Sequence, residues 1–244
     1  MTDNDPIAVC AQTVFDADNE RFLDIMTRPL AQRRKLFALF ALHYEIAKIP
    51  YITQEPMLAM MRLQWWRDAL GTLRNGLVEN HPIILALSQE ARDLDLDMAD
   101  RPITARHWDI EETEFSDLAA QLAYFSDTFG ALYALCGASL NLRPDICEQY
   151  GKIIGLQRYL HSAPALKSAG KTLFPDINGL LNEARRAQKA LPELVAQIRP
   201  LASDHRRVRR DMAFAITHWT EAAQPTIPDR PLHNKWLRLR ASIF

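Results

Sequence analysis

The 244-residue sequence has few of the residues on which turn-rich, disulfide-linked or metal-binding folds depend. It contains only 8 glycines beside 48% hydrophobic residues, and this composition favours helices around a sizeable core over a β-sheet protein with many turns. The three cysteines, Cys10, Cys136 and Cys147, are too few and too far apart for a disulfide framework or a zinc site. They are typical of a protein in a reducing compartment.

Long hydrophobic runs and a strong net charge are also missing. The longest uninterrupted apolar stretch, Leu36 to Leu42, is far shorter than the roughly 20 residues of a membrane-spanning helix. No basic residue precedes Arg21, which predicts neither a signal peptide nor a transit peptide. The net charge of −1 gives no global attraction to nucleic acid, so we expect no such partner. We therefore expect a cytoplasmic protein, with peripheral attachment to the inner membrane left open.

The residues that are present show helical hydrophobic periodicity in nearly every long segment. Three prolines mark predicted helix starts: Pro29, for a helix to about Lys48, then Pro56, and Pro82 after His81. Further helices are predicted at about 113–140, 143–160, 180–191 and 204–222, with an acidic connector at 93–100 and a loop at 162–174. The sequence therefore predicts one all-α domain over 1–244, with an N-terminal arm (1–20) and a C-terminal linker and tail (223–244).

A run with two tryptophans, Met61 to Leu70 (MRLQWWRDAL), carries the clearest family signal in the chain. Together with the helix at 33–45 and the segment Gly170 to Pro175, it resembles the squalene/phytoene synthase superfamily. The most similar branch contains the mitochondrial respiratory complex I assembly factor and its bacterial relatives. The resemblance extends over about residues 22–222, and it implies an all-α isoprenoid synthase-like bundle around a central apolar cavity.

In active members of this family, two helices carry aspartates that hold magnesium ions against the diphosphate of the substrate. Aligning the FALHY sequence with the first motif places Ala47, Lys48 and Tyr51 at its acidic positions. The frame of the second motif places Ser162 and Leu166 at the other pair. Residues four apart on a helix share a face, and hard cations need anionic oxygens that these side chains lack. The resemblance therefore predicts no catalytic residues, no metal site and no cofactor.

Several polar and aromatic residues remain candidates for a ligand site or a cavity wall. They are Tyr44, Lys48, Arg62, Trp65, Arg67, Gln157, Arg158 and Lys171. Trp65 and Trp66 point about 100° apart on a helix, so either both pack in the core or Trp65 lines a cavity or partner surface. Arg62 and Arg67 either bind an anion or pair with acids of the helix surface. Lys48 could meet a phosphate as a point charge.

The strongest local charge feature is a basic cluster formed by Arg206, Arg207, Arg209 and Arg210. A run of this kind is usually a solvated helix face. The alternative is a docking surface for an acidic partner or for anionic lipid. The tail from 232 to 244 adds to that alternative, because its basic residues alternate with apolar ones in an amphipathic pattern.

Acidic residues elsewhere in the chain have to be weighed as displaced metal ligands. Asp93 and Asp97 have the missing four-residue spacing, but a solvated acidic connector explains them more simply. Asp109 and Glu112 precede an apolar run, where acids in a first helical turn are favoured by the helix dipole. Among the 7 histidines no pair has metal-ligand spacing on a helix, and His43 on an apolar stripe fits a core residue.

The leading hypothesis from the sequence is a non-catalytic isoprenoid synthase fold that acts by binding. The resemblance implies a respiratory-complex subunit or another protein as the partner, in assembly or maturation of the complex. One alternative is a magnesium-dependent prenyl transferase that condenses two prenyl diphosphates, which would need carboxylates other than the lost ones. Another is an isoprenoid- or quinone-binding protein that performs no chemistry.

Overall fold

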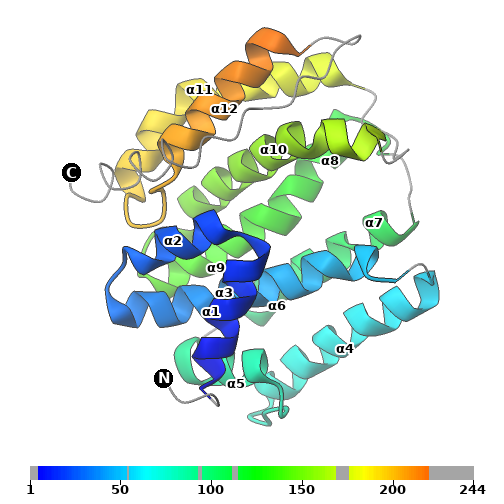
Figure 1. The fold of residues 1–244 in the computed structure, drawn as a ribbon, viewed down its shortest axis with the longest axis vertical. Helices are drawn as coiled ribbons and strands as arrows, with labels where there is room; N and C mark the ends of the chain where they lie inside the picture. The colour runs from blue at the N-terminus through cyan, green and yellow to red at the C-terminus, as the bar shows by residue number, and fades with distance from the viewer. Residues whose placement is uncertain (1–4, 54, 93–94, 112–114, 169–175, 220–244) are drawn as a thin grey trace. The chain divides into compact units, whose positions relative to one another are not determined.

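The computed structural model describes residues 5–53, 55–92, 95–111, 115–168 and 176–219, with the backbone alone for 164–168. Every secondary-structure element in these ranges is helical, which confirms the predicted all-α class (Figure 1). Backbone contacts divide the chain into two compact units, one formed by 1–113 and 131–144, the other by 114–130 and 145–244. Each unit is described by itself. The single domain and the central cavity stay predictions.

Unit 1 is built around a long buried helix. Its elements are α1 (Pro6–Ala17), α2 (Asn19–Met26), α3 (Leu30–Lys48), the short 3-10 helix η1 (Ile49–Tyr51), α4 (Pro56–Arg74), α5 (Pro82–Glu90), α6 (Leu96–Ala105), α7 (His107–Glu111) and α9 (Ala131–Ser139). The α3 residues from 36 to 43 are all buried, because α1, α5 and α9 pack around this helix. A helix that is apolar all round is stable only in such a core position.

The three predicted helix starts are confirmed. Pro29 immediately precedes α3, and Pro56 is the first residue of α4, where the missing N–H costs nothing. His81 precedes α5 as its N-cap, and its ring nitrogen Nδ1 accepts a hydrogen bond from the backbone N–H of Ile83 at 3.3 Å. Local chemistry at a helix end was sufficient to locate these boundaries.

Two segments of unit 1 differ from their predictions. The predicted N-terminal arm contains α1, because Asp5 caps Pro6 onwards and Ile7, Cys10 and Val14 form a buried stripe. The predicted acidic connector at 93–100 is wrong from Leu96 on, where α6 begins. Asp95 caps α6 by accepting from the Met98 N–H at 2.9 Å, and the apolar residues Ala99 and Ile103 bury its inner face.

Unit 2 contains α8 (Leu118–Phe125), a π-helical turn (Ser126–Gly130), α10 (Pro144–Ser168), α11 (Ile177–Gln197) and α12 (His205–His218). Helices α11 and α12 run side by side (Figure 1). The predicted loop at 162–174 is wrong for residues 162–168, which continue α10. Residues 169–174 lie outside the described residues. The predicted C-terminal linker and tail (223–244) lie outside them as well. The predicted helix over 113–140 is interrupted by the π-helical turn. Nowhere in the described part of the chain is a helix both long and apolar enough to cross a bilayer.

A glycine allows α8 and α10 to approach closely within unit 2. A Cβ atom at Gly155 would lie 3.0 Å from Cβ of Phe125 and 3.4 Å from its Cα, which is tighter than ordinary van der Waals contact. The Phe125 ring in turn packs against the ring of Tyr159, with the ring centroids 5.9 Å apart. The position therefore has no room for a large side chain.

The three cysteines are free thiols, and all are buried. Burial raises the pKa of Cys10 to about 12, with a smaller contribution from Asp5. Burial likewise raises the pKa of Cys147 to about 11, reinforced by Asp145. Both sulfurs therefore stay protonated at neutral pH.

Candidate functional site

The first set of positions expected to bind metal lies at the end of α3 and in η1. Ala47 is half-buried and Tyr51 is 61% exposed. Lys48 is half-exposed, and its Nζ lies 2.5 Å from Oε1 of Glu45, one turn earlier. The carboxylate of Glu45 is thus already neutralised by a cation. Lys48 is engaged in the same ion pair, which would have to break before Lys48 could bind a phosphate.

The second set of positions expected to bind metal, Ser162 and Leu166, lies near the C-terminal end of α10. Ser162 is half-buried, and its hydroxyl donates to the backbone carbonyl of Tyr159 at 3.2 Å. The side chain of Leu166 lies outside what the structure describes. Because α10 continues to Ser168, positions 162 and 166 keep the four-residue helical spacing that metal binding would use. These positions therefore have the helical spacing of the motif, and neither residue is a carboxylate.

A buried polar network lies between α2, α3 and α9, and sequence reasoning missed most of it. The Arg21 guanidinium donates to the Tyr133 hydroxyl at 2.6 Å and pairs with Asp24 Oδ2 at 3.3 Å. Asp18 accepts from the Arg21 backbone N–H at 2.9 Å and from the hydroxyl of the candidate Tyr44 at 3.2 Å. Arg21 and Asp24 are only 3% and 2% exposed. The available signal was an arginine and an aspartate three residues apart on one face of a helix.

The acids weighed as displaced metal ligands are engaged with arginines. Asp97 is paired with Arg74 at 2.6 Å, and Asp109 is paired with Arg106 at 2.8 Å. Asp93 and Glu112 lie outside the described residues. Asp109 lies in the first turn of α7, where the helix dipole favours an acid, and the apolar helix α8 that follows is capped by Asp117. Within the described ranges, no three histidine, cysteine or acidic side chains come together in a way that could hold a metal ion.

The arginines and tryptophans of α4 divide between structural and exposed positions. Arg67 binds Asp100 at 2.6 Å and the Thr104 hydroxyl at 2.9 Å, so it joins α4 to α6. Trp66 is 5% exposed and packs in the core, whereas Trp65 is 41% exposed. The edge of Trp65 meets the rings of both Trp66 and His81. Arg62 is exposed, and it has no ion-pair partner in the part of the chain that the structure describes.

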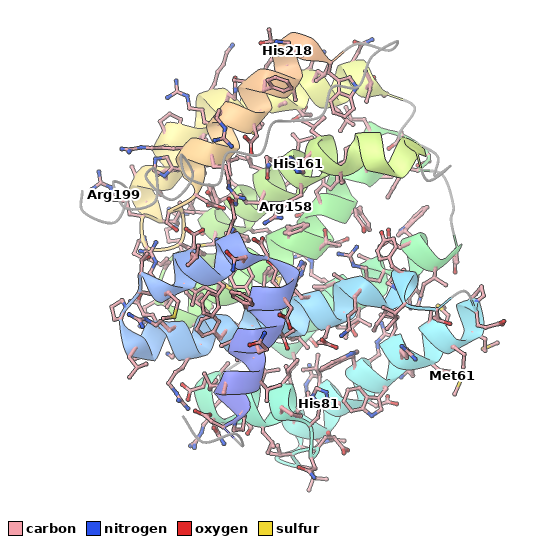
Figure 2. All side chains as sticks on the ribbon, viewed as in Figure 1. Met61, His81, Arg158, His161, Arg199 and His218 are labelled. Carbon is pink, nitrogen blue, oxygen red and sulfur yellow. The ribbon has the colours of Figure 1, made fainter. Side chains whose placement is uncertain are left out.

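One of the two candidates of α10, Gln157, contacts α12 in unit 2. Gln157 is buried, and its amide donates to Asp211 Oδ2 at 3.1 Å. Burial raises the pKa of Asp211, although hydrogen bonding and the charge of Arg210 act in the opposite direction. Arg158 is half-buried, and Figure 2 shows it on α10 near His161. Lys171 lies outside the described residues.

The basic cluster on α12 is partly neutralised by acids at the start of that helix or within it. Arg207 pairs with Asp204 at 3.2 Å and Arg210 with Asp211 at 2.6 Å. Arg206 is half-buried and Arg209 is exposed, and neither has an acidic partner among the described residues. Two of the four arginines expected to form a docking surface are therefore already paired with acids of unit 2.

Two hollows among the described residues were considered as ligand sites, and neither is lined by a predicted ligand residue. One in unit 1, of about 320 Å³, is lined by Leu73, Arg74, Arg92 and Leu96. One in unit 2, of about 200 Å³, is an apolar groove between α8, α10 and α11. A pocket that encloses an organic ligand usually has about 300–1,000 Å³ and mostly apolar walls. The first hollow is polar and the second is small, so neither is a good isoprenoid site.

The capping role of His81 predicts a pH-dependent stability for unit 1. Its Nδ1 accepts a hydrogen bond and must be unprotonated, and burial lowers the pKa of the ring. The folded state therefore binds this proton less readily than the unfolded state, whose histidine pKa is about 6.5. Stability is complete above that pH and falls as the pH drops below it.

We expect the His81→Asn variant to keep the helix cap, because asparagine is a good N-cap residue. Since asparagine does not ionise, the stability of this variant should not depend on protonation of the cap. Urea unfolding followed by circular dichroism between pH 7.5 and 5 measures the effect. The midpoint of the wild type should fall more steeply with decreasing pH than that of His81→Asn. Parallel curves for the two proteins would contradict the assignment.

Comparison with known proteins adds to this geometry. A family model described as Squalene/phytoene synthase matches residues 16–230. A solved structure described as a dehydrosqualene synthase in complex with ligand superposes with a TM-score of 0.81, over 98% of this chain and 95% of that chain. At 12% sequence identity the likeness shows the fold alone, and it confirms the isoprenoid synthase-like fold that the sequence predicted.

Two curated relatives carry the same description, "NADH dehydrogenase (ubiquinone) complex I, assembly factor 6 homolog". The one from Drosophila melanogaster is 25% identical over 226 residues, covering 83% of this chain. The one from Dictyostelium discoideum is 23% identical over 173 residues, covering 67% of this chain. The chain spans 66% of the length of the first relative and 48% of the second.

Proposed function

Because the chain belongs to the squalene/phytoene synthase family, we propose that it is a non-catalytic member that acts by binding, in the assembly of respiratory complex I. The observation that carries the proposal is the state of the positions where metal would bind. Ala47, Lys48, Tyr51 and Ser162 supply no carboxylate, and Glu45 beside them is paired with Lys48. The names of the two relatives support the choice of complex I.

The electrostatics of diphosphate departure make these losses decisive. A diphosphate that leaves an allylic carbon carries several negative charges, and divalent ions held by carboxylates stabilise them in the transition state. One lysine offers a single positive charge without the coordination geometry of a metal cluster. The acids considered as substitutes, Asp97 and Asp109, are held in ion pairs with Arg74 and Arg106.

What remains of the family in this chain is a helical frame with exposed binding surfaces. We propose a protein of the respiratory complex as the partner and the surface of the inner membrane as the place of action. An isoprenoid or quinone ligand is not part of the proposal, because the two hollows described above are unsuited to one.

Deleting the gene tests the proposal. The expected result is a several-fold loss of assembled complex I on native gels and of its NADH oxidation, with both restored by the wild-type gene. The purified protein, incubated with farnesyl or geranylgeranyl diphosphate and Mg²⁺, should release no diphosphate. Normal complex I in the deletion strain would refute the assembly role, and a hydrocarbon product would refute the absence of catalysis.

A further inference from the structure

An apolar face is exposed on the first half of α4. It consists of Met57, Leu58, Met61 and Trp65, whose exposed fractions are 72%, 47%, 62% and 41%. With 3.6 residues per turn, these four positions fall within an arc of about 100°. We call this surface, together with the adjacent Arg62, the α4 face. Figure 2 shows the side chain of Met61 pointing away from the helices of unit 1.

The α4 face is separate from the surface by which α4 packs in its own unit. Ala59, Leu63 and Trp66 form the buried side, roughly opposite the exposed methionines. Further along the helix the exposed arc becomes polar, since Asp68 follows Trp65 on the same side. The apolar exposure is thus confined to a defined patch. Large contiguous patches of this kind usually mark an interaction site.

Arg62 identifies the charge that the occupant of the α4 face should carry. The other two arginines of α4, Arg67 and Arg74, bind Asp100 and Asp97 at 2.6 Å. Arg62 is exposed and has no such partner in the described part of the chain. A carboxylate beside apolar side chains would complement it, and desolvation by the surrounding patch would strengthen the pair.

The residue types favour a protein over a lipid surface as the occupant. Methionine, tryptophan and arginine are the types enriched at protein interfaces, and methionine adapts its shape to a partner. An anionic bilayer would be repelled by the exposed acids Glu55 and Asp68, which lie at either end of the patch. Lys48, the nearest lysine before α4, is neutralised by Glu45. Arg62 alone is a weak basis for binding anionic lipid.

We propose that the α4 face is the docking surface for the protein partner, which presents an apolar surface with a carboxylate opposite Arg62. This inference rests on the proposed function, because it names where the complex I protein binds. It places Trp65 on that interface as an anchor held by T-shaped ring contacts with His81 and Trp66. The basic cluster on α12 has no role in it.

Photo-crosslinking with the full-length protein in its own cells tests the contact. Benzoylphenylalanine in place of Met61 should give an adduct that contains a complex I subunit or assembly intermediate. The same probe in place of Leu30, which is 69% exposed on α3, should give at least tenfold less of it. Arg62→Glu should reduce the adduct at position 61 by at least tenfold. Equal adducts at both positions, or adducts at 61 only with phospholipid or with a second copy, would overturn the proposal.

Complementation separates this inference from the proposed function. In the deletion strain, Met57→Asp/Met61→Asp should restore complex I at least fivefold less than the wild type, whereas Leu30→Asp should restore it fully. Equal melting temperatures of the purified variants show that all of them fold. If the wild type and the double variant restore complex I equally, the docking surface is refuted and the assembly role stands. If deletion leaves complex I unchanged, the assembly role itself is refuted.

Discussion

Replacing Arg21 by methionine is expected to lower the free energy of unfolding by about 3–5 kcal/mol. The guanidinium is buried between Asp24 and the Tyr133 hydroxyl and lies 5.0 Å from the ring centre of Phe40. Without it, Asp24 remains a carboxylate only 2% exposed that has lost the guanidinium beside it. Removing one member of a buried ion pair leaves the other desolvated, which costs more than the pair itself contributes.

Thermal unfolding followed by circular dichroism measures the effect, which corresponds to a fall in Tm of roughly 6–20 °C for a protein of this size. The double variant Arg21→Met/Asp24→Leu should recover most of the loss, because no buried charge is left unpaired. Arg34→Met is the matched control. It removes a half-exposed arginine bound to Glu90 at 2.7 Å, and should cost less than about 1 kcal/mol. Equal losses for Arg21→Met and Arg34→Met would contradict the assignment.

A second large effect is expected at the close contact between α8 and α10. Gly155→Leu would place a whole side chain where even an added Cβ atom would lie 3.0 Å from Phe125. The helices must separate or the Phe125 ring must leave its position against Tyr159, so we expect a loss of about 2–3 kcal/mol. Urea unfolding at pH 7 gives this value directly.

Two further glycine substitutions serve as controls for that experiment. Gly155→Ala should be close to neutral, because a gain of about 1 kcal/mol in helix propensity offsets a small displacement of Phe125. Gly71→Leu on α4 should stabilise by about 0.5–1 kcal/mol, since nothing lies within 4 Å of a Cβ atom there. A neutral Gly155→Leu would show that α8 and α10 are not tightly packed at this point.

Helix positions were predictable wherever the signal was local. Pro29, Pro56 and the His81-Pro82 pair locate three helix starts by their own backbone chemistry. The acids around Asp95 were misinterpreted as a connector, because an N-cap and a solvated loop have the same composition. The helical continuation to Ser168 was missed because polar residues such as His161 and Ser162 lie on the exposed side of a helix as readily as in a loop.

The contacts of the candidate site could not be predicted from the sequence. The register of one motif predicts that Ala47 and Tyr51 stand at its acidic positions, and this stays a prediction. The partners of the arginines depend on tertiary structure: Arg67 binds Asp100 across 33 positions, and Arg21 binds Tyr133 across 112. No local pattern encodes such distant pairs, so sequence reasoning left Arg67 with two interpretations and did not consider Arg21.

Because the cysteines are buried, the rate at which each thiol reacts depends on how often the structure around it opens. Alkylating reagents and peroxide attack the thiolate, and neither Cys10 nor Cys147 ionises or meets solvent in the closed state. Cys10, on α1 of unit 1, and Cys147, on α10 of unit 2, become reactive only when local opening exposes them. The labelling rates of the two thiols therefore measure separately how often α1 in unit 1 and α10 in unit 2 open.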